Sequence, residues 1–211
     1  MDKLKILAIG TKESLKKARG LQEDCRRFRY QFESITLKEH KHISHSQFET
    51  VDNIVRYFNK SWQEEKICVI HPESRILQPV PQDWIDSNLP VLFQKSDHID
   101  KAYNFNNELP HIYVGELFIC SNKDLWWMKW WRDAMESMKH ADVYPSSETM
   151  LAFALHFNSV KILKKTIKCN KEFKGEHEAV ISNLKNNVAV FKVYSKPKRL
   201  YLHSTILPAS G

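Results

Sequence analysis

The sequence predicts an α/β fold in which a central sheet is flanked by helices. Residues 67–70 are four consecutive apolar residues that end in a Pro-containing turn, as in a strand buried on both faces. At the start of the chain, the apolar residues 4–9 run through Gly10 and Thr11 into a charged amphipathic segment, residues 13–28. Many nucleotide-binding α/β domains begin with a strand, a tight turn and a helix. One glycine is too few for a dinucleotide fingerprint or a phosphate-binding loop.

The composition is that of a folded, soluble protein. Of the 211 residues, 42% are hydrophobic and 27% charged, and no apolar run approaches the roughly 18 residues that span a bilayer. The first ten residues hold too short an apolar segment for a signal peptide. The four cysteines are scattered without a Cys-x-x-Cys pair, which favours free thiols in a reducing compartment over disulfides or a zinc site. We therefore expect a single cytoplasmic domain over residues 1–211, without a membrane span.

Positive charge is concentrated near the end of the sequence. The net charge is +7, yet residues 161–211 alone hold eleven Lys or Arg against three Asp or Glu, a local charge of +8. A basic face of this kind is suited to the phosphates of a nucleotide or nucleic acid, or to an anionic glycan. Solvated lysines on edge strands, which oppose aggregation, are the plainer interpretation.

Local patterns predict the remaining elements. Strands are expected over residues 32–37, 89–93, 111–120, 160–169 and 188–194, and helices over 46–65, 124–139, 147–157 and 176–184. The helix at residue 46 would begin with a capping box, since Glu49 follows Ser46 at the required spacing. Residues 94–110 are polar and rich in Asn and Asp, and we expect a long loop there.

Three histidines, His40, His42 and His45, lie close together in the polar segment that follows the second predicted strand. Their spacing in a loop is compatible with metal binding. No fourth ligand is evident nearby, which favours an ordinary surface loop.

The predicted helix over residues 124–139 carries four tryptophans, Trp126, Trp127, Trp130 and Trp131, on one arc of about 140°. Such rings could stack on sugars or bases. A stripe of this kind is more often part of a hydrophobic core. We therefore expect a core position, with one or two rings reaching a functional site.

Polar side chains follow the buried central strand directly. His71, Glu73 and Arg75 come after residues 67–70, and ligands in open α/β sheets bind at strand ends, where loops and helix N-termini converge. A surface turn is the alternative. Gly115 interrupts a later strand, which marks a bulge or a close approach to the backbone, and Glu116 beside it is an unusual charge for a buried strand.

The order of these segments resembles the GT-A glycosyltransferases, the fold of glycogenin and its relatives. Residues 69–81, VIHPESRILQPVP, resemble the strand end at which that family binds its metal. Residues 113–119 with 122–138, and residues 142–155, resemble the strand, helix and acidic turn that follow. The resemblance covers about two thirds of the chain, in pattern more than in identity.

This resemblance implies a single-domain GT-A-like (Rossmann-like) fold with a mixed central sheet. It also implies a hexosyl- or pentosyltransferase that takes a sugar from a nucleotide-diphosphate sugar, expected to be a UDP-sugar. The acceptor would be a glycan or modified DNA.

The resemblance further assigns roles to residues at the site. The turn at Gly10 and Thr11 would hold the base and ribose. The positive side chains expected at the nucleotide are Arg75, Lys198 and Arg199. The candidate catalytic carboxylates are Glu148, Asp142 and Glu116. Glu148 or Asp142 would act as the base of an inverting enzyme.

The sequence departs from the family pattern at the metal site. It contains no Asp-x-Asp, and His71-Pro72-Glu73 stands in its place. His71 and Glu73, two residues apart, could share one divalent ion, with His203 as a further ligand. A mixed nitrogen and oxygen ligand set suits Mn²⁺ better than Mg²⁺. A metal-independent enzyme and a member of the fold without catalysis stay open.

A non-enzymatic nucleic-acid-binding protein is the alternative class of function. It would use the basic residues between 161 and 199 for backbone contacts and exposed aromatic side chains for stacking. It predicts salt-dependent binding and no affinity for nucleotide sugars. The sequence holds no helix-turn-helix, zinc-finger or RNA-recognition signature, so the transferase is favoured.

Overall fold

The computed structural model describes residues 4–40, 42–61, 65–95, 113–138, 147–169, 177–183 and 188–195. The strands are β1 (Leu4–Thr11), β2 (Gln31–Leu37), β3 (Lys66–Ile70), β4 (Arg75–Ile76), β5 (Val91–Lys95), β6 (Tyr113–Cys120), β7 (Leu163–Cys169), β8 (His177–Asn183) and β9 (Val188–Ser195). The helices are α1 (Lys12–Lys16), α2 (Arg19–Phe28), α3 (Ile43–Lys60), α4 (Gln82–Ile85), α5 (Leu125–Met138) and α6 (Ser147–Phe157), with a 3₁₀ turn, η1 (Asn122–Asp124). Among the described residues, none of the helices has the length and apolar character needed to cross a bilayer.

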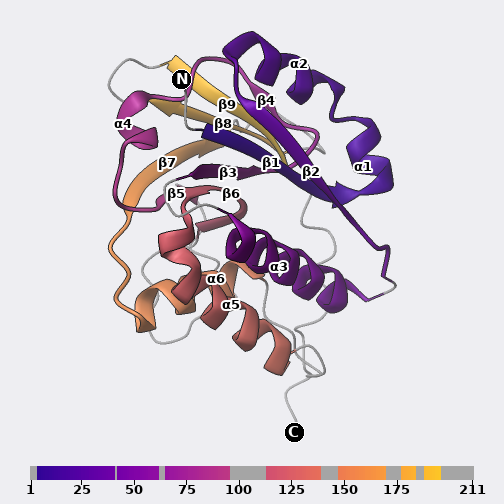
Figure 1. The fold of residues 1–211 in the computed structure, drawn as a ribbon, viewed down its shortest axis with the longest axis vertical. Coiled ribbons are helices and arrows are strands. Elements are labelled where there is room, and N and C mark those ends of the chain that lie inside the picture. The colour runs from indigo at the N-terminus through magenta and orange to yellow at the C-terminus, as the bar shows by residue number, and fades with distance from the viewer. Residues whose placement is uncertain are drawn as a thin grey trace, which may run out of the picture.

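The described strands form one mixed sheet in the order β2-β1-β3-β6-β5-β7-β8-β9-β4. β1 lies parallel between β2 and β3, whereas β6 runs antiparallel to both of its neighbours, β3 and β5. β5 pairs in parallel with β7, whose last residues continue into a smaller antiparallel group with β8, β9 and β4. Helices flank this sheet (Figure 1), so the predicted α/β class with a mixed central sheet is confirmed.

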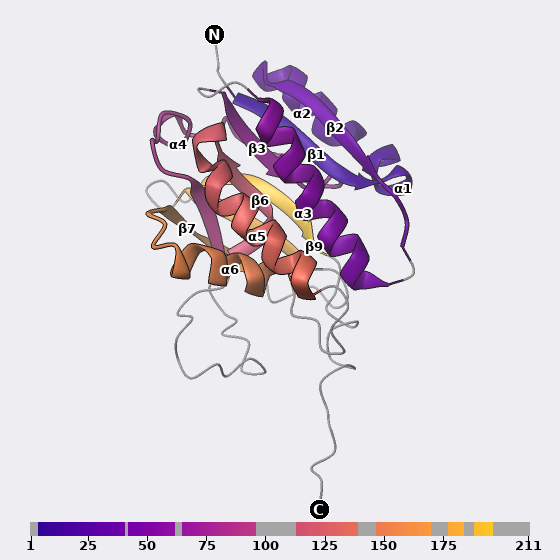
Figure 2. The ribbon, with the colours of Figure 1, turned by 60° about the horizontal axis from the view of Figure 1, so that its bottom comes forward.

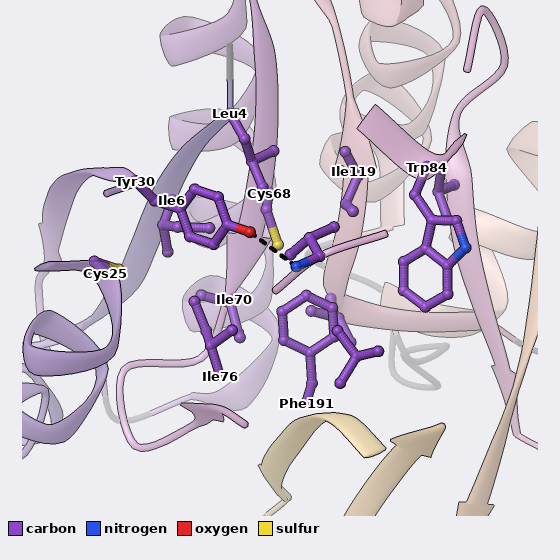
Figure 3. Close-up of a cluster of buried hydrophobic side chains, with 14 of the residues drawn as sticks. Leu4, Ile6, Cys25, Tyr30, Cys68, Ile70, Ile76, Trp84, Ile119 and Phe191 are labelled. Carbon is purple, nitrogen blue, oxygen red and sulfur yellow. Dashed lines mark hydrogen bonds between the residues drawn. The ribbon is translucent and has the colours of Figure 1, made fainter. Parts of the chain in front are cut away.

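Each face of the sheet carries its own hydrophobic core. The alternation of β1 shows the division, because Ile6 and Ala8 belong to the cluster that includes α2, whereas Leu7 and Ile9 belong to the cluster that includes α3, α5 and α6. Figures 1 and 2 show α3, α5 and α6 together on one side of the sheet. In the first core, the backbone N–H of Val80 donates to the hydroxyl of Tyr30 at 2.8 Å (Figure 3), which satisfies two buried polar groups.

The predicted burial of the central strand on both faces is confirmed. Residues 67–70 of β3 are each at most 2% exposed. Cys68 and Ile70 enter the first core, and Ile67 and Val69 enter the second. Full burial of an aliphatic side chain contributes about 1.5–3 kcal/mol to the stability of the folded state. The strand is therefore firmly anchored, and its end fixes where the polar turn after Ile70 begins.

The tryptophan stripe of α5 is divided between core and surface. Trp127 and Trp131 are fully buried in the second core, while 53% of Trp126 and 38% of Trp130 is exposed. The helix turns about 100° per residue, so each adjacent pair straddles the boundary between the buried and exposed faces. The expected core position is thus correct for two of the four rings.

The prediction of a helix over residues 176–184 is wrong. Residues 177–183 form β8, which pairs antiparallel with β9 from His177 opposite Ser195 to Asn183 opposite Val188. Pairing along the whole element outweighs the local sequence preference on which the helix prediction rested.

Two predicted helix boundaries also need correction. Residues 13–28 form two helices, because the N–H groups of Lys17 and Ala18 bond three residues back, to Ser14 and Leu15, and end α1. The third helix begins at Ile43 with His42 in the cap position, so the predicted capping box at Ser46 does not form.

Three cysteines are free and buried, as expected: Cys25, Cys68 and Cys120. Burial raises the pKa of the Cys25 thiol to about 12, with a smaller contribution from the neighbouring Asp24. Burial likewise raises the pKa values of Cys68 and Cys120. These thiols are neutral and unreactive near pH 7.

Candidate functional site

The carboxyl ends of β1 and β3 meet at one edge of the sheet. The two strands are parallel neighbours in a register that pairs Ala8 with Ile70, and Gly10 and Pro72 lie against each other just beyond that pair. A Cβ atom on Gly10 would lie 2.8 Å from Cγ of Pro72, well inside the normal separation of packed carbon atoms. The absence of a side chain at Gly10 therefore allows the two turns predicted to hold the nucleotide and the metal to come together.

Thr11 ends β1 and caps α1. Its Oγ1 accepts a hydrogen bond from the backbone N–H of Ser14 at 3.3 Å, and its carbonyl accepts one from the Ser14 hydroxyl at 3.0 Å. The Thr11 side chain therefore has a structural partner in the cap. Its predicted contact with a nucleotide stays a prediction.

Lys17 brings a positive charge to the same edge. Its Nζ lies 3.5 Å from Oε2 of Glu73, and its side chain is 60% exposed while that of Glu73 is 15% exposed. The two residues are far apart in the sequence and meet because α1 follows β1 and the polar turn follows β3. Sequence reasoning missed Lys17, since it is one of several lysines in a charged segment.

The contacts of His71 and Glu73 do not fit a resident divalent ion as they stand. The backbone N–H of Glu73 donates to Nδ1 of His71 at 3.3 Å, which leaves the proton of a neutral imidazole on Nε2 and makes that nitrogen a donor. The Glu73 carboxylate faces Lys17. In the part of the chain that the structure describes, no three His, Cys, Asp or Glu side chains are arranged around a metal position. The metal role of His71 and Glu73 stays a prediction for experiment.

Arg75 is held by a buried carboxylate that sequence reasoning missed. Its Nε and one terminal nitrogen donate to the two oxygens of Asp24 at 2.7 and 2.8 Å, and the N–H of Ile76 donates to Asp24 at 2.9 Å. Asp24 is only 4% exposed. The hydrogen bonds that Arg75 donates to Asp24 raise the pKa of the Arg75 guanidinium. Asp24 lies three residues after Leu21 and beside Cys25, on the apolar face of α2, and this was the available signal.

This pair fixes the turn that carries the candidate residues. Close packing supports it, because a Cβ atom on Gly20 of α2 would lie 2.9 Å from Cδ of Arg75. About half of the Arg75 side chain remains exposed, 48%. The structure thus gives Arg75 an anchoring contact at the site, and its predicted contact with phosphate is untested.

Glu148 lies against the first half of β6. That strand begins at the same edge, because it runs antiparallel to β3. A Cβ atom on Gly115 would be 3.7 Å from Cγ of Glu148, and the indole N–H of Trp131 donates to the carbonyl of Ser147 at 3.0 Å. Gly115 lies in a stretch where the register between β5 and β6 shifts, as a bulge would produce.

Other candidates cannot be placed. Glu116 belongs to β6, but its side chain is not described, and Asp142, Lys198, Arg199 and His203 lie outside the described residues.

The fold of this chain is similar to that of solved structures. One match is the crystal structure of a glycosyltransferase involved in the glycosylation of the major capsid of PBCV-1. The two structures agree with a TM-score of 0.52 over 77% of this chain and 81% of that chain. The fold is GT-A-like. The sequence identity is 12%, so the likeness establishes the fold alone. No family model and no curated protein matches the sequence.

Proposed function

We propose that this protein is a glycosyltransferase that moves a sugar from a nucleotide-diphosphate sugar to an acceptor hydroxyl. The observation that carries the proposal is the meeting of the Gly10 turn, Lys17 and the 71–75 turn at one edge of a GT-A-like sheet. Ligands of open α/β sheets bind at this edge. The donor we propose is a UDP-sugar, and the transferred group is a hexose or a pentose.

Departure of the diphosphate is the first chemical demand. As the bond between the anomeric carbon and the diphosphate oxygen breaks, negative charge accumulates on the leaving group, and a positioned cation stabilises that charge. Lys17 is an exposed cation whose partner at this edge, Glu73, is at 3.5 Å. We propose that Lys17 turns from Glu73 to the diphosphate when the donor binds. Lys198 and Arg199 are proposed to add positive charge there.

Activation of the acceptor is the second demand. Glu148 lies in the first turn of α6, against β6 where that strand starts. In an inverting reaction, we propose that Glu148 accepts the proton of the acceptor hydroxyl while the oxygen forms the new bond to the anomeric carbon. Asp142 and Glu116 are the alternative bases. The acceptor is a glycan or modified DNA, and the basic residues after 160 favour an anionic one.

A thermal-shift experiment with matched lysine variants tests the proposal. We expect UDP at about 100 times its Kd to stabilise the wild type by about 2.7 kcal/mol, a rise in Tm of roughly 5–10 °C. Lys17→Met should lose most of this rise, whereas Lys16→Met, an exposed neighbour on α1, should keep it. Repeating the series with Mn²⁺ and with Glu73→Ala tests the predicted metal. A rise that needs Mn²⁺ and vanishes in Glu73→Ala would assign metal to this turn.

The same screen distinguishes the alternative class. If no nucleotide or nucleotide sugar changes the Tm, but duplex DNA raises it at low salt and not at high salt, the transferase proposal fails. Loss of DNA binding with salt is the expected signature of phosphate contacts by Lys and Arg.

A further inference from the structure

The two helices that follow β1 carry a high positive charge. Residues 12–29 hold seven Lys or Arg against three Asp or Glu, a local charge of +4. One of the three acids, Asp24, is buried and paired with Arg75, so it does not offset the charge at the surface. The net charge of residues 1–160 is only −1, which conceals this concentration. The exposed cations of α1, α2 and the turn between them are Lys12, Lys16, Lys17, Arg19, Arg26 and Arg27.

These side chains form one basic face along the outside of the sheet. Leu15, Leu21 and Cys25 pack into the first core, which leaves the charged sides of α1 and α2 to solvent. Figures 1 and 2 show the two helices following each other along the side of the sheet opposite α3. Because β1 and β2 are parallel, the helices run from the edge of the candidate site, where β1 ends, to the opposite edge, where β2 begins. A row of phosphates along this face would therefore lead to the candidate site.

Helix stability does not explain these charges. Cations are favourable in the last turn of a helix, which accounts for Arg26 and Arg27. Lys12, in contrast, occupies the first position of α1, where a cation is unfavourable. Arg29 follows α2 in the left-handed backbone region, with a φ of 60°. Glycine is the usual residue there, because a side chain strains the backbone. A guanidinium is thus kept at a strained position, and such strain is concentrated at functional sites.

We propose that the basic face of α1 and α2 binds the sugar-phosphate backbone of duplex DNA. Lys and Arg side chains that neutralise phosphates release counterions, and this release supplies affinity for DNA whatever its sequence. Four of the seven cations are arginines, whose planar guanidinium groups bind phosphate oxygens in pairs. Arg26 and Arg27 form no ion pair with another described residue, so both are available to phosphates.

The lack of exposed aromatic side chains on this face favours a duplex over other partners. Unpaired bases stack on exposed aromatic rings, and a basic helix that binds membranes inserts apolar side chains into the lipid. Phe28 is only partly exposed, and the Arg27 guanidinium lies 5.0 Å from its ring centre. The face thus offers cations for a phosphate backbone and no platform for stacking. Among the described residues, the exposed large apolar side chains all lie on other elements: Leu89, Trp126, Trp130 and Phe157.

This inference deepens the proposed function. Binding of DNA follows from the charges of the face, whereas the role of that DNA as the acceptor rests on the proposed transferase activity. The two are measured separately, DNA affinity without a nucleotide sugar and the change in Tm by UDP without DNA. A wild type that UDP stabilises and that duplex DNA does not bind would keep the transferase proposal and overturn this inference.

Salt-dependent binding to a labelled duplex of mixed sequence tests the inference by fluorescence anisotropy. We expect the Kd of the full chain to rise steeply between about 50 and 200 mM salt. Arg26→Gln combined with Arg27→Gln should raise the Kd about tenfold at roughly 100 mM salt, and reduce the slope of log Kd against log salt by about 1–2. Lys123→Gln combined with Lys129→Gln removes the same charge from α5, on the other side of the sheet, and should leave the Kd close to that of the wild type.

Arg29→Gly separates binding from folding. Glycine relieves the strained backbone, so this variant should keep or raise the Tm while it weakens duplex binding. Melting curves show whether the Arg26 and Arg27 double variant folds, and Arg29→Gly decides the question if it does not. The inference is overturned if the folded variants bind the duplex as tightly as the wild type, or if single-stranded DNA or vesicles of anionic lipid bind the wild type more tightly than the duplex.

Discussion

At the scale of single residues, a buried carboxylate organises the turn after β3. Asp24 comes from α2, yet it receives both a two-point contact from Arg75 and the N–H of Ile76. Two-point pairing between guanidinium and carboxylate adds geometric specificity to the charge interaction. The Asp24 carboxylate is almost fully buried, so Arg75 is needed to stabilise its charge. The Arg75 side chain is 48% exposed, so water can solvate its charge without Asp24. The pair therefore serves mainly to hold residues 74–76 in place.

Removing the Arg75 guanidinium should be costly for this reason. We expect Arg75→Met to lower the free energy of unfolding by about 2–3 kcal/mol, since it leaves the Asp24 charge buried without its counter-ion. As a control, Arg19→Met breaks the exposed ion pair between Arg19 and Glu23 on α2 and should lower the free energy of unfolding by less than about 0.5 kcal/mol. Urea denaturation of both variants measures the difference. Equal losses would show that the Asp24 contact contributes no more than a surface pair.

At the scale of elements, the contact between α5 and α6 positions the candidate base. Trp131 is buried against Phe118 of β6, with ring centres 6.4 Å apart, and its indole N–H donates to Ser147 at the start of α6. Glu148 is the next residue. The placement of this carboxylate thus depends on a tryptophan in the preceding helix, across residues 139–146 of the chain.

Substitution at this contact tests the dependence. We expect Trp131→Phe to lower the free energy of unfolding by about 2 kcal/mol, because it removes buried volume and the indole hydrogen bond to the Ser147 carbonyl. Trp126→Phe, at a position that is 53% exposed, should change it by less than about 0.5 kcal/mol. Thermal or urea unfolding measures both variants. A Trp131→Phe chain as stable as the Trp126→Phe chain would contradict this account.

At the scale of the whole molecule, the sheet separates two cores, and both contain buried thiols. Cys25 and Cys68 lie in the core on the α2 side, and Cys120 lies in the core beneath α3 and α5. Burial raises the pKa of all three thiols above the ordinary value of about 9. Stability at alkaline pH therefore reports on the integrity of both cores.

The direction of the pH effect follows from proton binding. Above pH 9 the unfolded chain releases thiol protons that the folded chain still holds, so the free energy of unfolding falls as pH rises. For Cys25 the fall continues to about pH 12, where the folded thiol ionises. Each thiol contributes at most about 1.4 kcal/mol per pH unit. We expect urea unfolding under reducing conditions to show this decline from about pH 9 upward. Cys25→Ala should show a shallower slope, and a flat profile in the wild type would exclude buried thiols.

Much of the fold could be predicted because its elements follow local patterns. The apolar run at residues 67–70 is buried on both faces as expected, and β1, β2, α6 and β9 lie close to their predicted positions. These patterns reflect how a side chain faces one or two cores, which nearby residues already encode. The strand β8 was missed because its partner, β9, rather than its own sequence, determines its structure.

The candidate site, like the fold, could be predicted from the sequence only in part. Local sequence patterns suffice to predict that a glycine turn and a polar cluster follow the first and third strands, because strand ends and turns have local signatures. Which side chains meet depends on the packing of the folded chain, as in the pairs Lys17 with Glu73, Asp24 with Arg75, and Glu49 with His40. The first two pairs join residues more than fifty positions apart, and the third pairs a loop with a helix. Such contacts depend on how separate layers pack, and no spacing within one segment specifies that packing.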